Sequence, residues 1–257
     1  MNKLFDTHAH LPLLEHRSAA EAIARANGEG VEFMTTVSTE FENWEKNRAL
    51  AHQYPNIYYT VGLHPHEGKD WPKHKSAMLE FLKAHRNDGK CVGVGETGLD
   101  FFYNHSDREA QITSFEDQIE LSKQFELPLI IHCRDAFVET YDSLRKVGMS
   151  SRGGIMHCFT GNTAQAKEAV DLGLYISFSG IVTFKNADSL REAAKSVPHD
   201  RILIETDCPF LTPLPHRGVP NEPFYLPYTA NVLSGLLGLT PEKFAEISTA
   251  NAKRVFL

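Results

Sequence analysis

Short apolar runs alternate with longer amphipathic stretches along all 257 residues, and this alternation restricts the fold more than any other feature. Apolar runs bounded by turn residues are typical of buried strands, whereas apolar residues spaced by three and four are typical of helices. Strands are predicted at residues 4–8, 33–37, 57–61, 91–96, 129–132, 154–157, 174–177 and 201–205. Helices are predicted at residues 18–28, 42–52, 75–86, 107–125, 137–147, 163–172, 187–196, 228–237 and 241–255. Eight strands that alternate with helices match a (β/α)8 barrel in number and in chain length.

An open doubly wound sheet is the main competing fold. It usually has fewer strands, and a glycine-rich phosphate loop follows its first strand. No Gly-x-Gly-x-x-Gly follows the first predicted strand here, and no internal repeat or flexible linker divides the chain. The proline-rich segment 209–227 is expected to form a long loop. We therefore predict an α/β protein with a (β/α)8 TIM-barrel fold and a single domain, residues 1–257.

The charge and the apolar runs exclude some classes of partner. The formal net charge of −7 argues against a broad basic surface that holds nucleic acid through many phosphates, although metal ions and a few arginines could still hold one phosphate. No apolar run approaches the ~18 residues that a membrane span requires, and the N-terminal residues lack an apolar leader. A cytoplasmic protein without a membrane partner is expected, and a monomer is compatible with the sequence.

Histidines and carboxylates gather where the predicted strands end. In a (β/α)8 barrel these strand ends converge on the catalytic face, and residues two apart on a strand share a side. The residues are His8, His10, His64, Glu96, His132, His157 and Asp207. Divalent metal ions neutralise such a cluster most simply, and six ligands with one shared carboxylate suit a pair of ions ~3.5–4 Å apart. The sequence thus predicts two divalent ions; the nitrogen and oxygen donors suit Zn, Mn, Co or Ni better than Ca, and Mg stays open.

Seven short motifs follow one another in a fixed order along nearly the whole chain. They are FDTHAH at 5–10, GLHP at 62–65, GVGETGLD at 93–100, PLIIHCR at 128–134, ETDCP at 205–209, PHRG at 215–218 and NAKRVF at 251–256. In order and spacing they resemble the TatD family of metal-dependent deoxyribonucleases, within the wider amidohydrolase-like barrels.

The resemblance implies a ligand set that includes a shared carboxylate. Pro12 stands where many members carry a carboxylate or Asn, and Val138 stands at another position that is acidic in the family. Both departures lie outside the implied ligands, so they bear on the substrate more than on the metal. The implied ligands are His8, His10, Glu96 and Asp207 for one ion and Glu96, His132 and His157 for the other, with Glu96 bridging.

The expected reaction is hydrolysis of a DNA phosphodiester by a metal-activated water. Asp207 is the predicted general base, because it lies at the metal and can take a proton. Arg134 and Arg217 are candidates for phosphate contact, since a guanidinium matches phosphate geometry, and His64 is a candidate for contact with substrate or leaving group. Asp6 and Glu205 are expected behind the ligands, supporting them by hydrogen bonds.

Two other functions remain open on the sequence. The same pair of ions could hydrolyse an ester, lactone or amide, including an aminoacyl ester on tRNA or a phosphotriester, because the fold and the metals do not determine the substrate. From a different class, the chain could be a non-catalytic metal-binding barrel. The complete set of ligand residues argues against that second alternative.

Overall fold

The computed structural model describes residues 3–257. The N-terminal segment was predicted to lack an apolar leader, and its first two residues, Met1 and Asn2, lie outside the described range. The strands are β1 (Leu4–Ala9), β2 (Val31–Thr36), β3 (Ile57–Val61), β4 (Cys91–Asp100), β5 (Leu129–Arg134), β6 (Gly154–Met156), β7 (Tyr175–Phe178) and β8 (Ile202–Ile204). The α-helices are α1 (Ala19–Gly28), α2 (Phe41–Gln53), α3 (Trp71–His85), α4 (Arg108–Phe125), α5 (Phe137–Val147), α6 (Thr163–Asp171), α7 (Asp188–Ser196), α8 (Leu226–Leu236) and α9 (Pro241–Phe256). Short 3₁₀ helices are η1 (Leu11–Leu13), η2 (Pro65–Asp70), η3 (Gly180–Thr183), η4 (His199–Arg201) and η5 (Pro223–Tyr225). Every predicted strand and helix is present, with some ends shifted.

The strands are parallel and follow one another in the order β1 to β8, which is the order of the predicted (β/α)8 class. By its internal contacts the chain divides into two compact units, and the predicted single-domain organisation stays a prediction. The first unit comprises the residues up to Thr36 and His157–Val255, and the second comprises Val37–Met156.

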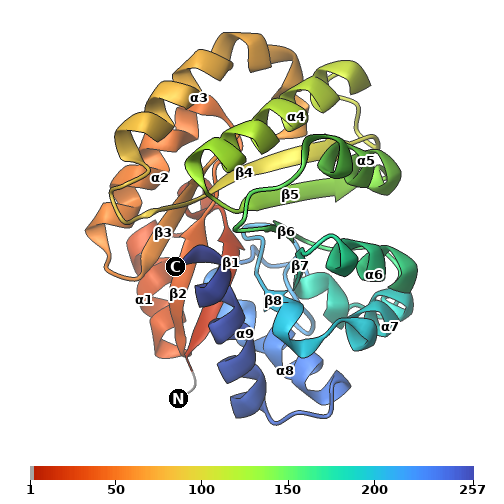
Figure 1. Ribbon diagram of the computed structural model, residues 1–257. Helices are drawn as coiled ribbons and strands as arrows, with labels where there is room; N and C mark the ends of the chain where they lie inside the picture. The colour runs from red at the N-terminus through yellow and green to blue at the C-terminus, as the bar shows by residue number, and fades with distance from the viewer. Residues whose placement is uncertain (1–2) are drawn as a thin grey trace. The chain divides into compact units, whose positions relative to one another are not determined.

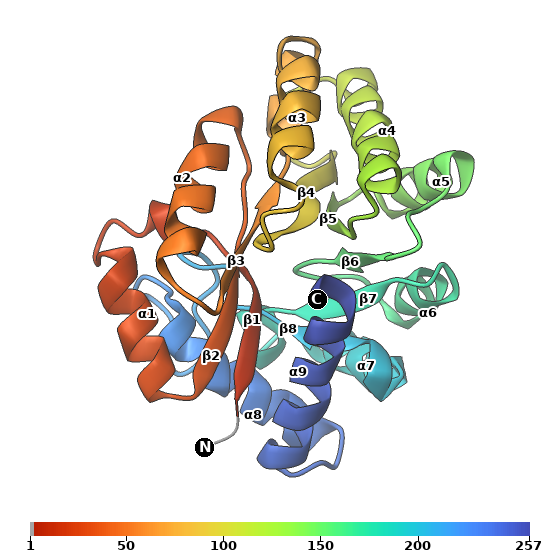
Figure 2. The same ribbon diagram turned by 60° about the vertical axis from the view of Figure 1, so that its left-hand side comes forward.

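In the first unit, β1 pairs with β2 and β7 pairs with β8, all parallel. Ala9, which ends β1, forms a parallel bridge with Cys208, so the segment after β8 lies beside the end of β1. Helices α6 and α7 pack against each other (Figure 2), and Phe5, Met34 and Phe178 are fully buried in the core. This unit therefore brings the first and the last strand of the fold together.

In the second unit, β3, β4, β5 and β6 pair in succession. Helix α4 packs along β4, with α3 beside it (Figure 1), and Trp44, Tyr59 and Phe115 are buried in the core. β4 extends to Asp100, beyond the end predicted at residue 96, because its last residues continue to pair with β5 as far as Arg134.

Two helix starts show how local sequence sets the ends of elements. α1 begins with the predicted capping box, in which Ser18 accepts a hydrogen bond from the Glu21 backbone and the Glu21 carboxylate accepts one from Ser18. α3 begins at Trp71, four residues before the prediction; Pro72 suits a first turn, and the buried Trp71 indole donates to Asp117 in α4. The contact of Trp71 with Asp117 accounts for the earlier start, which the apolar periodicity of the sequence did not indicate.

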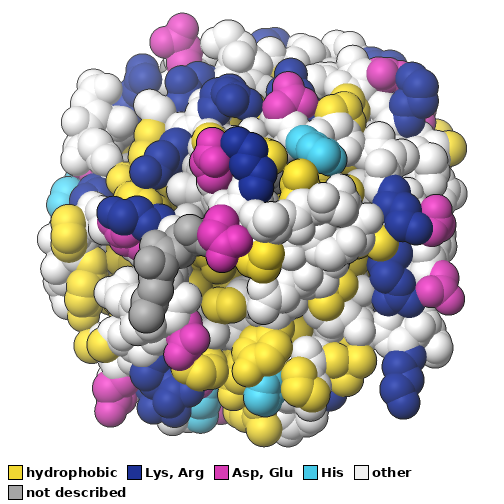
Figure 3. Space-filling view, turned by 90° about the horizontal axis from the view of Figure 1, so that it is seen from below, with side chains coloured by type: hydrophobic (Ala, Val, Ile, Leu, Met, Phe, Trp, Pro, Cys, Tyr) yellow, Lys and Arg dark blue, Asp and Glu magenta, His cyan; other side chains and the backbone are white. Residues whose placement is uncertain are grey.

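No helix within residues 3–257 combines the length and the apolar character that crossing a membrane requires. The face drawn in Figure 3 carries Lys and Arg side chains interspersed with Asp and Glu, and no broad basic area forms there. This distribution agrees with the charge argument from the sequence.

The partly buried carboxylate of Asp88 connects three elements of the second unit, α2, β3 and the start of β4. Its Oδ2 atom accepts hydrogen bonds from Tyr59 Oη (2.8 Å) and His52 Nε2 (3.0 Å), and its Oδ1 atom accepts from the backbone N–H groups of Lys90 (2.8 Å) and Cys91 (3.0 Å). Burial acts to raise the pKa of Asp88, but these hydrogen bonds outweigh it and hold the pKa below its usual value.

We expect Asp88→Asn to lower the unfolding free energy by about 1.5–3 kcal/mol, because hydrogen bonds to a charged acceptor are lost. The contribution of a carboxylate with a lowered pKa is present above the unfolded pKa of about 3.9 and is lost as the pH falls through the folded value. Denaturant-induced unfolding at pH 7 and below pH 4 measures the loss of stability in Asp88→Asn and its disappearance in acid. Asp171→Asn, which removes an exposed partner of Lys167, is the control and should change stability little. Equal stability of Asp88→Asn and wild type at pH 7 would contradict the assignment.

Candidate metal centre

His8 in β1, His10 directly after β1 and Asp207 after β8 form the first cluster, which lies within the first unit. The Nε2 atoms of His8 and His10 are 3.2 Å apart, and Asp207 Oδ1 lies 3.4 Å from His10 Nε2 and 3.8 Å from His8 Nε2. The backbone holds this arrangement: Asp207 N–H donates to the His8 carbonyl, and His10 N–H donates to the Cys208 carbonyl, both at 2.9 Å. The structure thus brings together three of the predicted ligands.

The donor atoms of this first cluster fit a divalent cation. One nitrogen from each imidazole and one carboxylate oxygen lie within 4.8 Å of one another, and all three residues are buried. Two imidazoles and a carboxylate are a common donor set for zinc and related ions. His8 and His10 direct ring nitrogens at one another, an arrangement that a cation between their lone pairs would satisfy.

Asp6 lies directly behind the first cluster and connects its two segments. Asp6 Oδ2 accepts a hydrogen bond from Thr206 Oγ1 (2.6 Å), and Oδ1 accepts from the backbone N–H groups of Thr206 (2.9 Å) and His8 (3.4 Å). Complete burial raises the pKa of Asp6 to about 7, with the Glu205 carboxylate adding to the rise and the Thr206 hydrogen bonds opposing it. The structure therefore places Asp6 in a position to support the ligands rather than among them.

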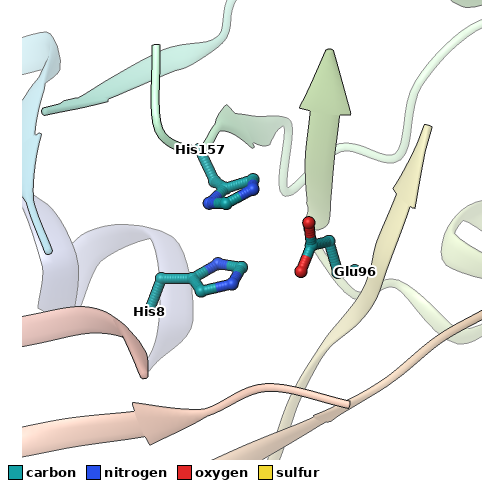
Figure 4. A group of neighbouring side chains, drawn as sticks. All are labelled: His8, Glu96 and His157. Carbon is teal, nitrogen blue, oxygen red and sulfur yellow. The ribbon is translucent and has the colours of Figure 1, made fainter. Parts of the chain in front are cut away.

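His157 belongs to the same unit and stacks on His8. The ring centroids are 3.8 Å apart with planes inclined by 14° (Figure 4). Its Nδ1 atom lies 3.1 Å from Glu205 Oε1, which also accepts a hydrogen bond of 2.6 Å from the Cys158 backbone N–H. A carboxylate on one ring nitrogen is the usual support of a metal-binding histidine. Glu205 thus contacts one ring nitrogen of His157, and its supporting role stays a prediction.

The second cluster lies within the second unit and has Glu96 at its centre. Glu96 Oε1 lies 2.9 Å from His132 Nδ1 and 3.4 Å from His64 Nε2, and the three side chains form a second group of potential ligands. Burial lowers the pKa of His64 to about 4, although Glu96 acts to raise it, so the imidazole is neutral at neutral pH. His64, predicted from the sequence to contact substrate or leaving group, thus lies beside two of the predicted ligands.

Asp100 and His66, which were not among the residues predicted from the sequence, extend this second cluster. Asp100 Oδ2 lies 3.1 Å from His132 Nε2 and 3.1 Å from His66 Nε2. Burial acts to raise the pKa of Asp100, but hydrogen bonds from His132 and from backbone N–H groups outweigh it and hold the pKa well below its usual range. Two signals were available: His66 follows His64 at the same spacing as the His8 and His10 pair, and Asp100 ends the motif that contains Glu96.

The two arginines predicted to contact phosphate lie against aromatic rings. The guanidinium carbon of Arg134, at the end of β5, is 4.2 Å from the centroid of Phe102 and 4.5 Å from that of Tyr103. The guanidinium carbon of Arg217, in the loop after β8, is 4.2 Å from the centroid of the Phe184 ring. Neither arginine is among the potential metal ligands.

Comparisons with known proteins identify the family of this chain. The model of the family described as TatD related DNase matches residues 5–257. An uncharacterized metal-dependent hydrolase of Bacillus subtilis, YabD, is 42% identical over 254 residues, which cover 98% of each chain. A protein of Salmonella typhimurium named 3'-5' ssDNA/RNA exonuclease TatD is 34% identical over 242 residues, covering 92% of each.

Among solved structures, that of the TatD homolog YJJV from Escherichia coli resembles this chain with a TM-score of 0.89 and 31% identity. The likeness covers 98% of this chain and 97% of the other, so the fold is shared along the whole length. The chain therefore belongs to the TatD-related DNase family of metal-dependent hydrolases.

Proposed function

We propose that this protein hydrolyses phosphodiester bonds of DNA with two divalent ions. One observation carries the proposal: each unit contains a group of ligand atoms that combines two imidazoles with one carboxylate, carried by strands or by the segments that follow them. The exonuclease name of the Salmonella relative supports the choice of substrate. Zn, Mn, Co and Ni suit the donors best, and Mg remains a candidate.

The first ion is assigned to His8, His10 and Asp207, and the second to Glu96 and His132. His157, whose Nδ1 atom contacts Glu205, completes the set proposed for the second ion. His64 lies within reach of Glu96 and is a further candidate ligand. The bridging role of Glu96 between the two ions stays a prediction from the family resemblance.

Bound divalent ions would supply Lewis-acid stabilisation of phosphoryl oxygens and a lower pKa for water. Asp207 is the proposed general base. Its side chain is 12% exposed, compared with 1% for His8 and 5% for His10, so it is the member of the first cluster that solvent reaches most readily. Asp6 would act through its hydrogen bonds by holding Thr206, and with it the segment that carries Asp207.

The proposal predicts metal-dependent hydrolysis of DNA. Labelled single-stranded and double-stranded DNA should be cut by the purified protein, cutting should stop with a chelator, and a divalent ion added in excess should restore it. An ester and an aminoacyl-tRNA, assayed in parallel, test the alternative substrates. Turnover of either of these, with DNA left intact at every metal concentration, would contradict the proposal.

A bridging Glu96 predicts that one substitution disturbs both ions. Wild type dialysed against excess metal should retain close to two ions per chain by elemental analysis, and Glu96→Ala should retain fewer than one, because a shared ligand is lost from both sites. Glu242→Ala removes an exposed carboxylate at the start of α9 and should retain the wild-type content. A single ion that survives Glu96→Ala would refute the bridge.

Asp207→Asn separates proton transfer from metal binding. The amide preserves the shape and one ligand oxygen but removes the base, so turnover should fall by ~10²–10⁴-fold while much of the metal remains. Asp6→Asn changes only the support of the ligands and should cost ~10–100-fold. DNA hydrolysis and metal content are measured for both variants in one buffer. Near-wild-type turnover of Asp207→Asn with full metal content would show that another group takes the proton.

A further inference from the structure

Two adjacent aromatic side chains stand exposed directly after β4. Phe102 is 55% exposed and Tyr103 is 49% exposed, and their ring centroids are 4.9 Å apart with planes inclined by 89°. Rings of this size are normally buried, so a neighbouring pair left in solvent indicates a binding surface more than a packing defect. His105 stacks on Tyr103 with planes inclined by 13° and also packs edge-on against His66.

Arg134 completes this surface, which we call the aromatic platform and define as Phe102, Tyr103 and Arg134. Its guanidinium lies against both rings, and within residues 3–257 Arg134 forms no ion pair with a carboxylate. A guanidinium whose face rests on an aromatic ring still directs its N–H groups outward in its own plane, where they can bind phosphate. The platform thus combines aromatic surface with a positive charge that no carboxylate neutralises.

Asp100 holds the platform at a fixed place beside the second cluster. Its Oδ1 atom accepts hydrogen bonds from the backbone N–H groups of Phe102 (3.0 Å) and Tyr103 (2.9 Å), while its Oδ2 atom faces His132. His132 in turn contacts Glu96. The Asp100 carboxylate therefore connects the platform directly to His132, a proposed metal ligand, within one compact unit.

We propose that the aromatic platform is a subsite on which one unpaired nucleobase of a DNA strand stacks. A phosphate next to that nucleotide would bind Arg134. The proposal rests on the proposed nuclease function and adds the residues that would hold a base next to the reacting bond. An aromatic ring accepts any base, since every base has a π face, and the base has to be unstacked from its neighbours to reach the ring. The platform would therefore position the strand without reading its sequence.

Binding of short oligonucleotides in the presence of a chelator tests the stacking without turnover. The probes are a thymidine oligonucleotide and the same strand with one abasic residue, moved along the strand in successive probes. Wild type should bind the intact strand more tightly than the strand that is abasic at one particular position. The double variant Phe102→Leu/Tyr103→Leu should bind the intact strand roughly 5- to 150-fold more weakly than wild type. The double variant should also bind intact and abasic strands equally. Tyr58→Leu, which removes the half-buried ring under Lys90 at the start of β3, should behave as wild type.

Salt dependence tests the role assigned to Arg134. One phosphate contact to a single strand contributes about 0.7 to the slope of log affinity against log salt, so Arg134→Gln should reduce the slope by that amount. Arg134→Lys should restore the slope but not the full affinity, because an ammonium lacks the flat stacking face. Arg201→Gln, which removes an arginine that lies against Tyr175, should leave the slope unchanged.

The outcomes separate this proposal from the nuclease proposal. If wild type cuts DNA but binds intact and abasic strands equally at every position, the stacking subsite is wrong and the nuclease function stands. If wild type neither binds nor cuts DNA, both are wrong. If the Leu substitutions dissociate a dimer in sedimentation and leave DNA binding unchanged, the rings serve contact with a second copy of the chain, which also overturns the subsite.

Discussion

The hydrogen bonds of the buried Asp6 carboxylate determine the geometry of the first cluster. Asp6 receives the Thr206 hydroxyl and two backbone N–H groups, one from each segment that carries a potential ligand. A buried carboxylate without such partners would cost several kcal/mol, so these contacts have to persist for the first unit to fold. The elevated pKa of Asp6, about 7, reflects the cost of that burial. The juxtaposition of His8, His10 and Asp207 follows from this connection together with the backbone hydrogen bonds that join the same two segments.

Asp100 is likewise a buried carboxylate that accepts hydrogen bonds and joins two groups of residues, here in the second unit. Its pKa is lowered, whereas that of Asp6 is raised. Its carboxylate is ionised, with a pKa held well below the usual range, and it faces His132 on one side and two backbone N–H groups on the other. The second cluster and the aromatic platform therefore both contact the same side chain. A change at Asp100 is expected to act on metal binding and on strand binding together, whereas a change in the rings of Phe102 and Tyr103 acts on strand binding alone.

Much of the fold was predictable because periodicity is a local property. All eight strands and the capping box of α1 were identified from sequence, while the extension of β4 depends on pairing with β5, a long-range contact. The same limit applies to the clusters. The spacing of His8 and His10 placed both on one side of a strand, but the grouping of His64 with Glu96 depends on how neighbouring strands align. The exposure of Phe102 was unpredictable, since apolar residues in a sequence are expected to be buried.

Anomalous diffraction from crystals soaked in a zinc or manganese salt would show directly whether the two clusters bind the proposed divalent ions. We expect one peak within ~2.0–2.2 Å of the nearest donor atoms of His8, His10 and Asp207, and a second within that distance of Glu96 and His132. Anomalous peaks that avoid both clusters at saturating metal, or their complete absence, would show that neither cluster is a metal site.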